Sequence, residues 1–321
     1  MNPNEPGGSP PQLIVAEHQL VRLIGSGSGG EVWLARNALG TYRAVKIIFR
    51  KSFPWPQPYE NEFHGLLKFE PLSRQHDGLV DVLQVGGNTE ADCFYYVMEL
   101  ADDVHTGQKI DPAYYWPRTL AHDLVERHRL PIGECIRLGA PIASALGFLH
   151  HHGLIHRDVK PANIIFVNGF PKLADAGLVT DMFKTRSRVG TEGYIAPEGP
   201  GTARADIYAL GKVLYEISTG NDRNKYPELP VEWDSPEEAK DLVEFNKIIL
   251  KACRTNPRLR YLDAQEMLSD LLAFQFSTRS PFEMKSMRSY VAWAGIIGLL
   301  AAAGLVVFLV WRILSLLSHP A

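Results

Sequence analysis

Short runs in which apolar and polar residues alternate dominate the first third of the chain. These runs lie at residues 18–25, 31–37, 41–49, 79–86 and 93–100. Alternation with a period of two predicts strands that each bury one face, and the Gly and Asn residues between the first three runs predict turns. A helix-like segment at residues 59–69 interrupts the series. The pattern predicts a small sheet with one helix over about residues 13–100.

Apolar positions three or four residues apart replace this alternation in the second part of the chain. They predict helices at residues 118–128, 133–153, 205–219, 239–255 and 263–276. Pro141 falls inside the second helix, where a proline should kink the helix or shift its start. The segment 102–118 is rich in turn residues and aromatics, and we expect a loop insertion there. The fold class is therefore α+β, with a β-rich lobe at about 13–100 and a helical lobe at about 101–276.

The two ends of the chain differ from this central part. Residues 1–12 are rich in Pro, Gly and Asn, and we expect a flexible leader. Residues 291–311 carry no charge, and about 20 apolar residues are enough to cross a bilayer as a helix. A buried core helix is the alternative, but it would normally show a polar stripe. We expect a transmembrane helix at 291–311, after a juxtamembrane linker at 277–290.

Charge on the flanks predicts how this span is oriented. Three basic residues lie within residues 279–288, whereas Arg312 alone follows the span directly. Positive residues favour the cytoplasmic side, so the protein is expected to be a single-pass membrane protein with the two lobes in the cytoplasm. A short tail, residues 312–321, would lie outside. Ala294, Gly298 and Ala302 give the span a small-residue face that would permit self-association.

The overall charge and the cysteines argue against a nucleic-acid-binding protein, a disulfide-stabilised fold and a zinc site. The formal net charge is -3, so no electrostatic argument points to nucleic acid. Cys93, Cys135 and Cys253 lie far apart without CxxC spacing. They fit reduced, buried thiols better than a disulfide framework or a zinc site.

Gly25, Gly27 and Gly30 have GxGxxG spacing, which alone is weak evidence because glycine clusters are usually turns. A dinucleotide-binding loop needs a helix after the third glycine, and strands follow here. A hairpin whose amides approach phosphates fits better. Lys46, one strand later among apolar neighbours, is either a snorkelling surface residue or a phosphate ligand. Glu60 or Glu62 on the next helix could hold it in place.

The segment 156–163 carries the strongest chemical signal. It combines His156, Arg157, Asp158, Lys160 and Asn163 between two apolar runs, and a purely structural loop does not need these residues together. The spacing HRDxxxxN matches a phosphoryl-transfer loop, in which a carboxylate accepts a hydroxyl proton and an amide oxygen holds magnesium.

On these motifs the chain resembles the Hanks-type, eukaryotic-like serine/threonine protein kinases, and bacterial members in particular, over about residues 21–274. The segment GTEGYIAPE at 190–198 supports this, because it resembles protein kinases rather than small-molecule kinases. The resemblance implies a two-lobed kinase domain at 13–276 that transfers the γ-phosphoryl group of ATP to protein Ser and Thr hydroxyls, its own included. It implies Mg²⁺, or Mn²⁺ in its place, as the metal.

The resemblance also implies a role for individual residues. Asp158 would be the catalytic base, with Lys160 and Thr191 beside it, and Glu62, rather than Glu60, would pair with Lys46. Asn163 and Asp175 would hold the metal. The ATP site would comprise Ile24, Gly25, Gly27, Gly30, Val32, Ala44, Lys46, Met98, Glu99 and Ala101.

Three further residues would support this site. Glu198 should pair with Arg260, and Asp206 should brace the catalytic loop.

Arg157 before Asp158 implies control by a phosphate on the activation segment, for which Ser187 is the first candidate, followed by Thr185 and Thr180.

Asp175 has two interpretations. An acid before a small pair after a strand is ordinary turn chemistry, but its position after the catalytic loop matches the metal-binding Asp of the family. Ala176 departs from the family, which usually has Phe there. That departure keeps open an alternative function, a pseudokinase-like scaffold that binds nucleotide without transferring phosphate.

Overall fold

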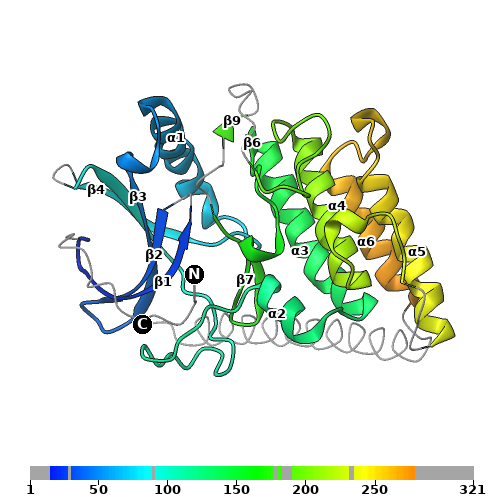
Figure 1. Ribbon diagram of the computed structural model, residues 1–321, viewed down its shortest axis with the longest axis horizontal. Helices are drawn as coiled ribbons and strands as arrows, with labels where there is room; N and C mark the ends of the chain where they lie inside the picture. The colour runs from blue at the N-terminus through cyan, green and yellow to red at the C-terminus, as the bar shows by residue number, and fades with distance from the viewer. Residues whose placement is uncertain are drawn as a thin grey trace, which may run out of the picture. The chain divides into compact units, whose positions relative to one another are not determined.

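A five-stranded antiparallel sheet makes up the first part of the protein (Figure 1). The structure is a computed structural model, and it describes residues 15–27, 30–88, 91–175, 180–181, 190–230 and 235–278. The strands of the sheet are β1 (His18–Gly27), β2 (Gly30–Asn37), β3 (Tyr42–Phe49), β4 (Val82–Asn88) and β5 (Cys93–Met98). They lie in the order β1-β2-β3-β5-β4. A short turn, η1 (Arg50–Ser52), leads into helix α1 (Pro56–Ser73), which packs beside β4.

The two faces of this sheet have different neighbours. Trp33, Val45 and Val97 point to one face and form a buried apolar cluster with Val15, the first described residue. Successive side chains of a strand point to opposite faces, so Lys46 and its cross-strand neighbours lie on the other face. That second face carries the polar chemistry described below.

Helices form the second part of the protein. They are α2 (Leu120–Arg127), α3 (Ile132–His151), α4 (Ala203–Thr219), α5 (Pro236–Ala252) and α6 (Ala264–Thr278), with the short turns η4 (Arg223–Lys225) and η5 (Pro257–Leu259). Figure 1 shows α3, α4 and α5 side by side, and α3 contacts both of the others. Thr119, Thr202 and Ser235 cap the starts of α2, α4 and α5 by accepting backbone N–H bonds, which explains where these helices begin.

Four short strands frame the loop that carries the HRDxxxxN spacing. β6 (Leu154–Ile155) pairs with β9 (Thr180–Asp181), and β7 (Ile164–Val167) forms a hairpin with β8 (Phe170–Leu173). The loop lies between β6 and β7 and ends in the short turn η2 (Pro161–Asn163). Two fixed strand ends therefore anchor the loop.

The predicted two-lobed architecture, a β-rich lobe followed by a helical lobe, is confirmed. Pro141 lies inside α3, which runs unbroken from Ile132, so the proline does not shift the start of the helix. The insertion 102–118 is a loop, as predicted, and is tied to β1 because Arg22 donates to the carbonyl of Ala113 at 3.1 Å.

Several sequence predictions fall on residues that the structure does not describe. They are the leader, the juxtamembrane linker from residue 279, the predicted span 291–311 with its small-residue face, the tail 312–321, Ala176 and the candidate phosphosites Ser187 and Thr185. Within the described ranges, α3 is the one helix long and apolar enough to cross a bilayer, and most of it is buried. The chain divides into two units, residues 1–273 and 274–321, and the described part of the second unit is the last turn of α6.

Candidate active site

The glycine hairpin between β1 and β2 contains glycines that are needed for different reasons. Gly30 pairs with Gly27 and has φ +110°, and a Cβ on Gly30 would lie 2.2 Å from the carbonyl oxygen of Ile47. No side chain fits there, whereas a Cβ on Gly27 would meet nothing within 4 Å. Gly30 therefore lets β2 lie close to β3, and Gly25 and Gly27 leave the outer part of the hairpin uncovered.

Lys46 lies in the middle of β3 with only 5 % of its surface exposed. It pairs with Val32 on β2 and with Tyr96 on β5, so the three side chains share one face of the sheet. Its ammonium donates a hydrogen bond to Asp175 and forms an ion pair with it. Burial is the largest single effect and lowers the pKa of Lys46, but Asp175, Tyr96 and Glu62 together outweigh it, so the pKa is raised and the ammonium stays charged.

The expected pairing of Lys46 with Glu62 is not formed. Glu62 lies on α1 and is buried, and its Oε1 has no hydrogen-bond partner among the described residues. Burial raises the pKa of Glu62 to about 8, against the opposing effect of Lys46. At neutral pH the carboxyl is therefore mostly protonated, and it loses Lys46 to the more exposed Asp175.

Asp158, Lys160 and Thr191 form a closed polar triangle. The Lys160 ammonium lies 2.7 Å from Oδ2 of Asp158 and donates to Oγ1 of Thr191 at 2.8 Å. The Thr191 hydroxyl in turn donates to Oδ1 of Asp158 at 2.8 Å. The carboxylate and the ammonium come from the loop at residues 156–163, and the hydroxyl comes from residue 191, so the three groups meet between two segments that are distant in the sequence. Asp158 is fixed from two sides.

Asp206 at the start of α4 holds the backbone of this loop. Its carboxylate accepts the N–H groups of His156 and Arg157, both at 2.8 Å, and contacts Nε2 of His150 at 2.9 Å. Arg157 has φ +72°, an uncommon conformation for a residue with a side chain. Because Asp206 is 1 % exposed, water cannot replace these bonds, and the carboxylate stabilises the turn that places Asp158.

Asn163 and Asp175 offer oxygen ligands on adjacent segments. The Asn163 amide donates from Nδ2 to the carbonyl oxygen of Asp158 at 2.8 Å and to its Oδ2 at 2.9 Å. This orientation leaves Oδ1 of Asn163 without a protein donor in the described part of the chain. The N–H of Ala174 donates to the carbonyl oxygen of Asn163 at 2.8 Å, which sets Asp175 beside it. A carboxylate and an amide oxygen are the ligands that Mg²⁺ prefers, so these residues fit that ion.

Residues 98–101 connect the two lobes and carry backbone groups that are not used in hydrogen bonds. Met98 pairs with Ala44 across the sheet, and the N–H of Glu99 donates to the carbonyl oxygen of Asp81 at 3.1 Å. Within the described residues, neither the carbonyl of Glu99 nor the N–H of Ala101 makes a hydrogen bond. An acceptor and a donor two residues apart match the edge of a purine base such as adenine.

The remaining predicted residues lie near this centre or support it. Glu198 and Arg260 form a bidentate ion pair at 2.6 and 2.7 Å, with the Arg260 side chain fully buried. Ile24 and Val32 are half-buried near the glycine hairpin, and Thr180 pairs with Ile155 in the short β6–β9 sheet.

One residue beside Lys46 was not anticipated. The hydroxyl of Tyr96 is buried and has no hydrogen-bond partner among the described residues. Burial raises the pKa of Tyr96, so it stays a neutral phenol. The sequence did carry a signal for it: Tyr96 lies two residues before Met98, so its side chain points to the same face of the sheet as that of Met98.

Comparison with known proteins agrees with this arrangement. The model of the protein kinase domain family matches residues 18–291. A probable serine/threonine-protein kinase of Clostridium perfringens is 31% identical over 291 residues, covering 81% of this chain and 38% of its own length. The kinase PknB of Mycolicibacterium smegmatis is 30% identical, covering 82% and 43%, and PrkC of Bacillus subtilis is 29% identical, covering 80% and 40%.

The chain thus spans about two fifths of the length of these relatives. The family match extends over both lobes and includes every residue of the polar centre described above. The chain belongs to the protein kinase domain family.

Proposed function

We propose that this protein is a serine/threonine protein kinase that transfers the γ-phosphoryl group of ATP to hydroxyls of protein substrates. The triangle of Asp158, Lys160 and Thr191 carries the proposal, because it combines a proton acceptor with a fixed cation. The names of the relatives, which are serine/threonine-protein kinases, point the same way.

Asp158 acts as the proton acceptor in this proposal. The oxygen of the substrate hydroxyl forms a bond to the γ-phosphorus, its proton passes to the Asp158 carboxylate, and the bond from the phosphorus to the β-phosphate oxygen breaks to release ADP. Lys160 offsets negative charge on the transferred group. Thr191 keeps Asp158 oriented through its 2.8 Å bond. Such positioning supplies most of the rate enhancement in phosphoryl transfer.

Lys46 and the backbone at residues 99–101 bind ATP in the same proposal. The Glu99 carbonyl and the Ala101 N–H receive the adenine edge, and the hairpin at Gly25 and Gly27 covers the phosphates. Lys46, charged and buried, exchanges Asp175 for phosphate oxygens when ATP binds. Ile24, Val32, Ala44 and Met98 line the base through their apolar side chains.

Asn163 and Asp175 would hold Mg²⁺, or Mn²⁺ in its place. When bound, the ion supplies positive charge to the phosphate oxygens. Asn163 already points its amide nitrogen at Asp158, which leaves its oxygen for the ion. Glu62 stays protonated near neutral pH and leaves Lys46 to Asp175 and the nucleotide.

We also propose that residues 291–311 span a membrane and hold the catalytic domain in the cytoplasm. The support is the charge-free run of that length and the basic residues before it. The full chain should stay with membranes after carbonate extraction, and a chain with two arginines introduced in the middle of the run should not. Equal extraction of both would contradict the span.

Control by self-phosphorylation is a further part of the proposal. Arg157 precedes Asp158, and hydroxyls at Thr180, Thr185 and Ser187 lie on the segment between β8 and Thr191. Intact mass after incubation with ATP should increase by whole phosphates, and alanine at Ser187 should remove one. An unchanged mass in an active preparation would contradict this control.

A nucleotide-binding scaffold without transfer is the second candidate, favoured by the direct pairing of Lys46 with Asp175. The deciding experiment uses the full chain in mild detergent, ATP labelled on the γ-phosphate, a generic protein substrate and a titration of Mg²⁺. Labelled Ser or Thr that requires the metal, and that Asp175→Asn abolishes, would support the kinase. ATP binding without labelled product would support the scaffold.

A further inference from the structure

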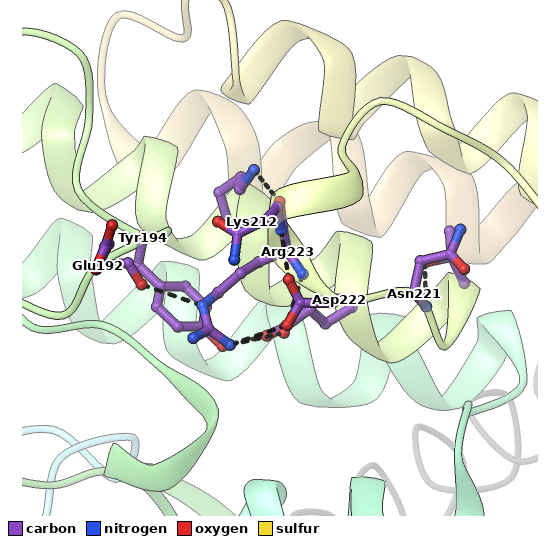
Figure 2. A network of polar contacts seen from close by, with 9 residues as sticks. Glu192, Tyr194, Lys212, Asn221, Asp222 and Arg223 are labelled. Carbon is purple, nitrogen blue, oxygen red and sulfur yellow. Dashed lines mark hydrogen bonds and ion pairs between the residues drawn. The ribbon is translucent and has the colours of Figure 1, made fainter.

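Arg223, from the turn after α4, lies against the segment that follows Thr191. Figure 2 shows its side chain reaching across the ring of Tyr194, with the guanidinium carbon 4.9 Å from the ring centroid. Its Nε donates to the carbonyl oxygen of Glu192 at 3.1 Å, and its Nη1 lies 3.5 Å from carboxylate oxygens of both Glu216 and Asp222. An arginine from a distant turn thus becomes part of the surface beside the catalytic loop.

The structure is built to hold this arginine in place. Gly193 has φ +88°, and a Cβ there would lie 2.6 Å from Nε of Arg223, so the glycine makes room for the side chain. The ammonium of Lys212 donates to the carbonyl oxygen of Arg223. Asp222 caps the turn by accepting the N–H of Asn224 at 2.8 Å. Two hydrogen bonds thus fix the backbone of the turn, and Gly193 leaves the room that the Arg223 side chain occupies.

This position is within reach of residues that flank a bound acceptor hydroxyl. Thr191 contacts both Asp158 and Lys160, and Glu192 is the next residue in the chain. An extended peptide advances about 3.3 Å per residue, so residues two or three positions from the acceptor span the distance to neighbouring side chains of this segment. The charges around Arg223 are therefore charges that a substrate would meet.

Glu216 is the acid that Arg223 covers. Its carboxylate is 11% exposed and has three partners: the hydroxyl of Tyr194 and the backbone N–H of Arg223, which both donate to it, and the guanidinium of Arg223. Burial and the Glu216 carboxylate raise the pKa of Tyr194, so the phenol remains a neutral donor. Burial lowers the pKa of Arg223, but the combined effect of Tyr194, Glu216 and Asp222 is larger and raises the pKa overall. The guanidinium therefore stays charged. Without Arg223, the two carboxylates would lack their shared cation.

We propose that Arg223 determines the charge preference for residues flanking the acceptor, because it neutralises Glu216 and denies that carboxylate to basic side chains of a substrate. The inference rests on the proposed function. It predicts that the unmodified protein discriminates little in favour of basic residues at these positions. Loss of the guanidinium would create a site that selects them.

The test compares Arg223→Ala with the unmodified full chain on synthetic peptides. Each peptide has one Ser acceptor and carries Arg, Ala or Glu at a single position within three residues of that acceptor. Arg223→Ala should raise the Arg-to-Ala ratio of transfer rates at one or more positions by about three- to fivefold, the size of a partly exposed ion pair. Adding Glu216→Gln should return the ratio to that of the unmodified protein.

Lys225→Ala is the matched control, since it removes a nearby exposed cation whose side chain makes no hydrogen bond or ion pair within the described residues. It should leave the ratio unchanged. If Arg223→Ala folds poorly, Arg223→Gln removes the same charge with a longer side chain.

Unchanged ratios in Arg223→Ala would overturn the inference. So would loss of a preference for acidic peptides without any gain for basic ones, because the guanidinium would then read the substrate directly. Fluorescence anisotropy with the same peptides gives the ratio of their dissociation constants without transfer. A silent transfer assay would therefore count against the kinase, whereas the binding ratio would still decide the role of Arg223.

Discussion

Replacing Asp206 by asparagine should destabilise the protein and slow phosphoryl transfer. The carboxylate accepts two backbone N–H groups at 2.8 Å and contacts His150 at 2.9 Å, in a position that is 1 % exposed. Asparagine keeps one acceptor oxygen and turns an NH₂ group towards the other N–H. Losing one charged hydrogen bond and leaving a buried N–H unpaired should lower the free energy of unfolding by about 3 kcal/mol.

Urea unfolding, followed by tryptophan fluorescence, measures this loss. Asp263→Asn is the control, because Asp263 is an exposed cap that accepts the N–H of Glu266 at 2.8 Å. Asparagine caps helices about as well as aspartate, so its effect should stay within about 0.5 kcal/mol. Transfer by Asp206→Asn should fall by at least about tenfold, since the loop no longer fixes Asp158. A stability equal to that of Asp263→Asn would refute the reasoning.

Three further predictions concern other parts of the structure. Because the pKa of Glu62 is about 8 in the folded protein against 4.5 as its ordinary value, the native state loses stability as pH rises from 5 to 8. A glutamine at position 62 cannot ionise, so the unfolding free energy of Glu62→Gln minus that of the unmodified protein should increase from pH 5 to pH 8. A difference that stays constant over this range would contradict the prediction. Glu198→Gln leaves the fully buried Arg260 without its carboxylate and should cost about 2–3 kcal/mol in urea unfolding, less than a fully buried pair because Glu198 is 25% exposed. Gly30→Ala, whose Cβ would meet a carbonyl oxygen at 2.2 Å, should lower the melting temperature, whereas Gly27→Ala has open space and should not; equal effects would argue against the strain.

Most of the architecture could be predicted because single residues decide it locally. Alternating positions specify the strands, and Thr202 and Ser235 specify where α4 and α5 begin. The catalytic loop was recognisable because five polar groups stand together in eight residues. Such features do not depend on contacts with residues that are distant in the sequence.

The partners of Lys46 could not be predicted in the same way. Spacing along the chain allows either Glu62 or Asp175 to pair with it. The choice depends on burial, which raises the pKa of Glu62 and leaves its carboxyl mostly neutral. Arg223 was missed for a similar reason, because its position depends on the room left by Gly193, 30 residues earlier. Both features arise from tertiary packing rather than from a local pattern.

The most direct measurement is the initial rate of γ-phosphoryl transfer to a Ser-containing protein by the full chain and by Asp158→Asn, with Asp263→Asn as the control. If Asp158 accepts the hydroxyl proton, Asp158→Asn should transfer at least about a hundredfold more slowly, the usual size of a general-base contribution, while Asp263→Asn keeps the full rate. An Asp158→Asn rate equal to that of the unmodified protein would contradict the assignment of the active site.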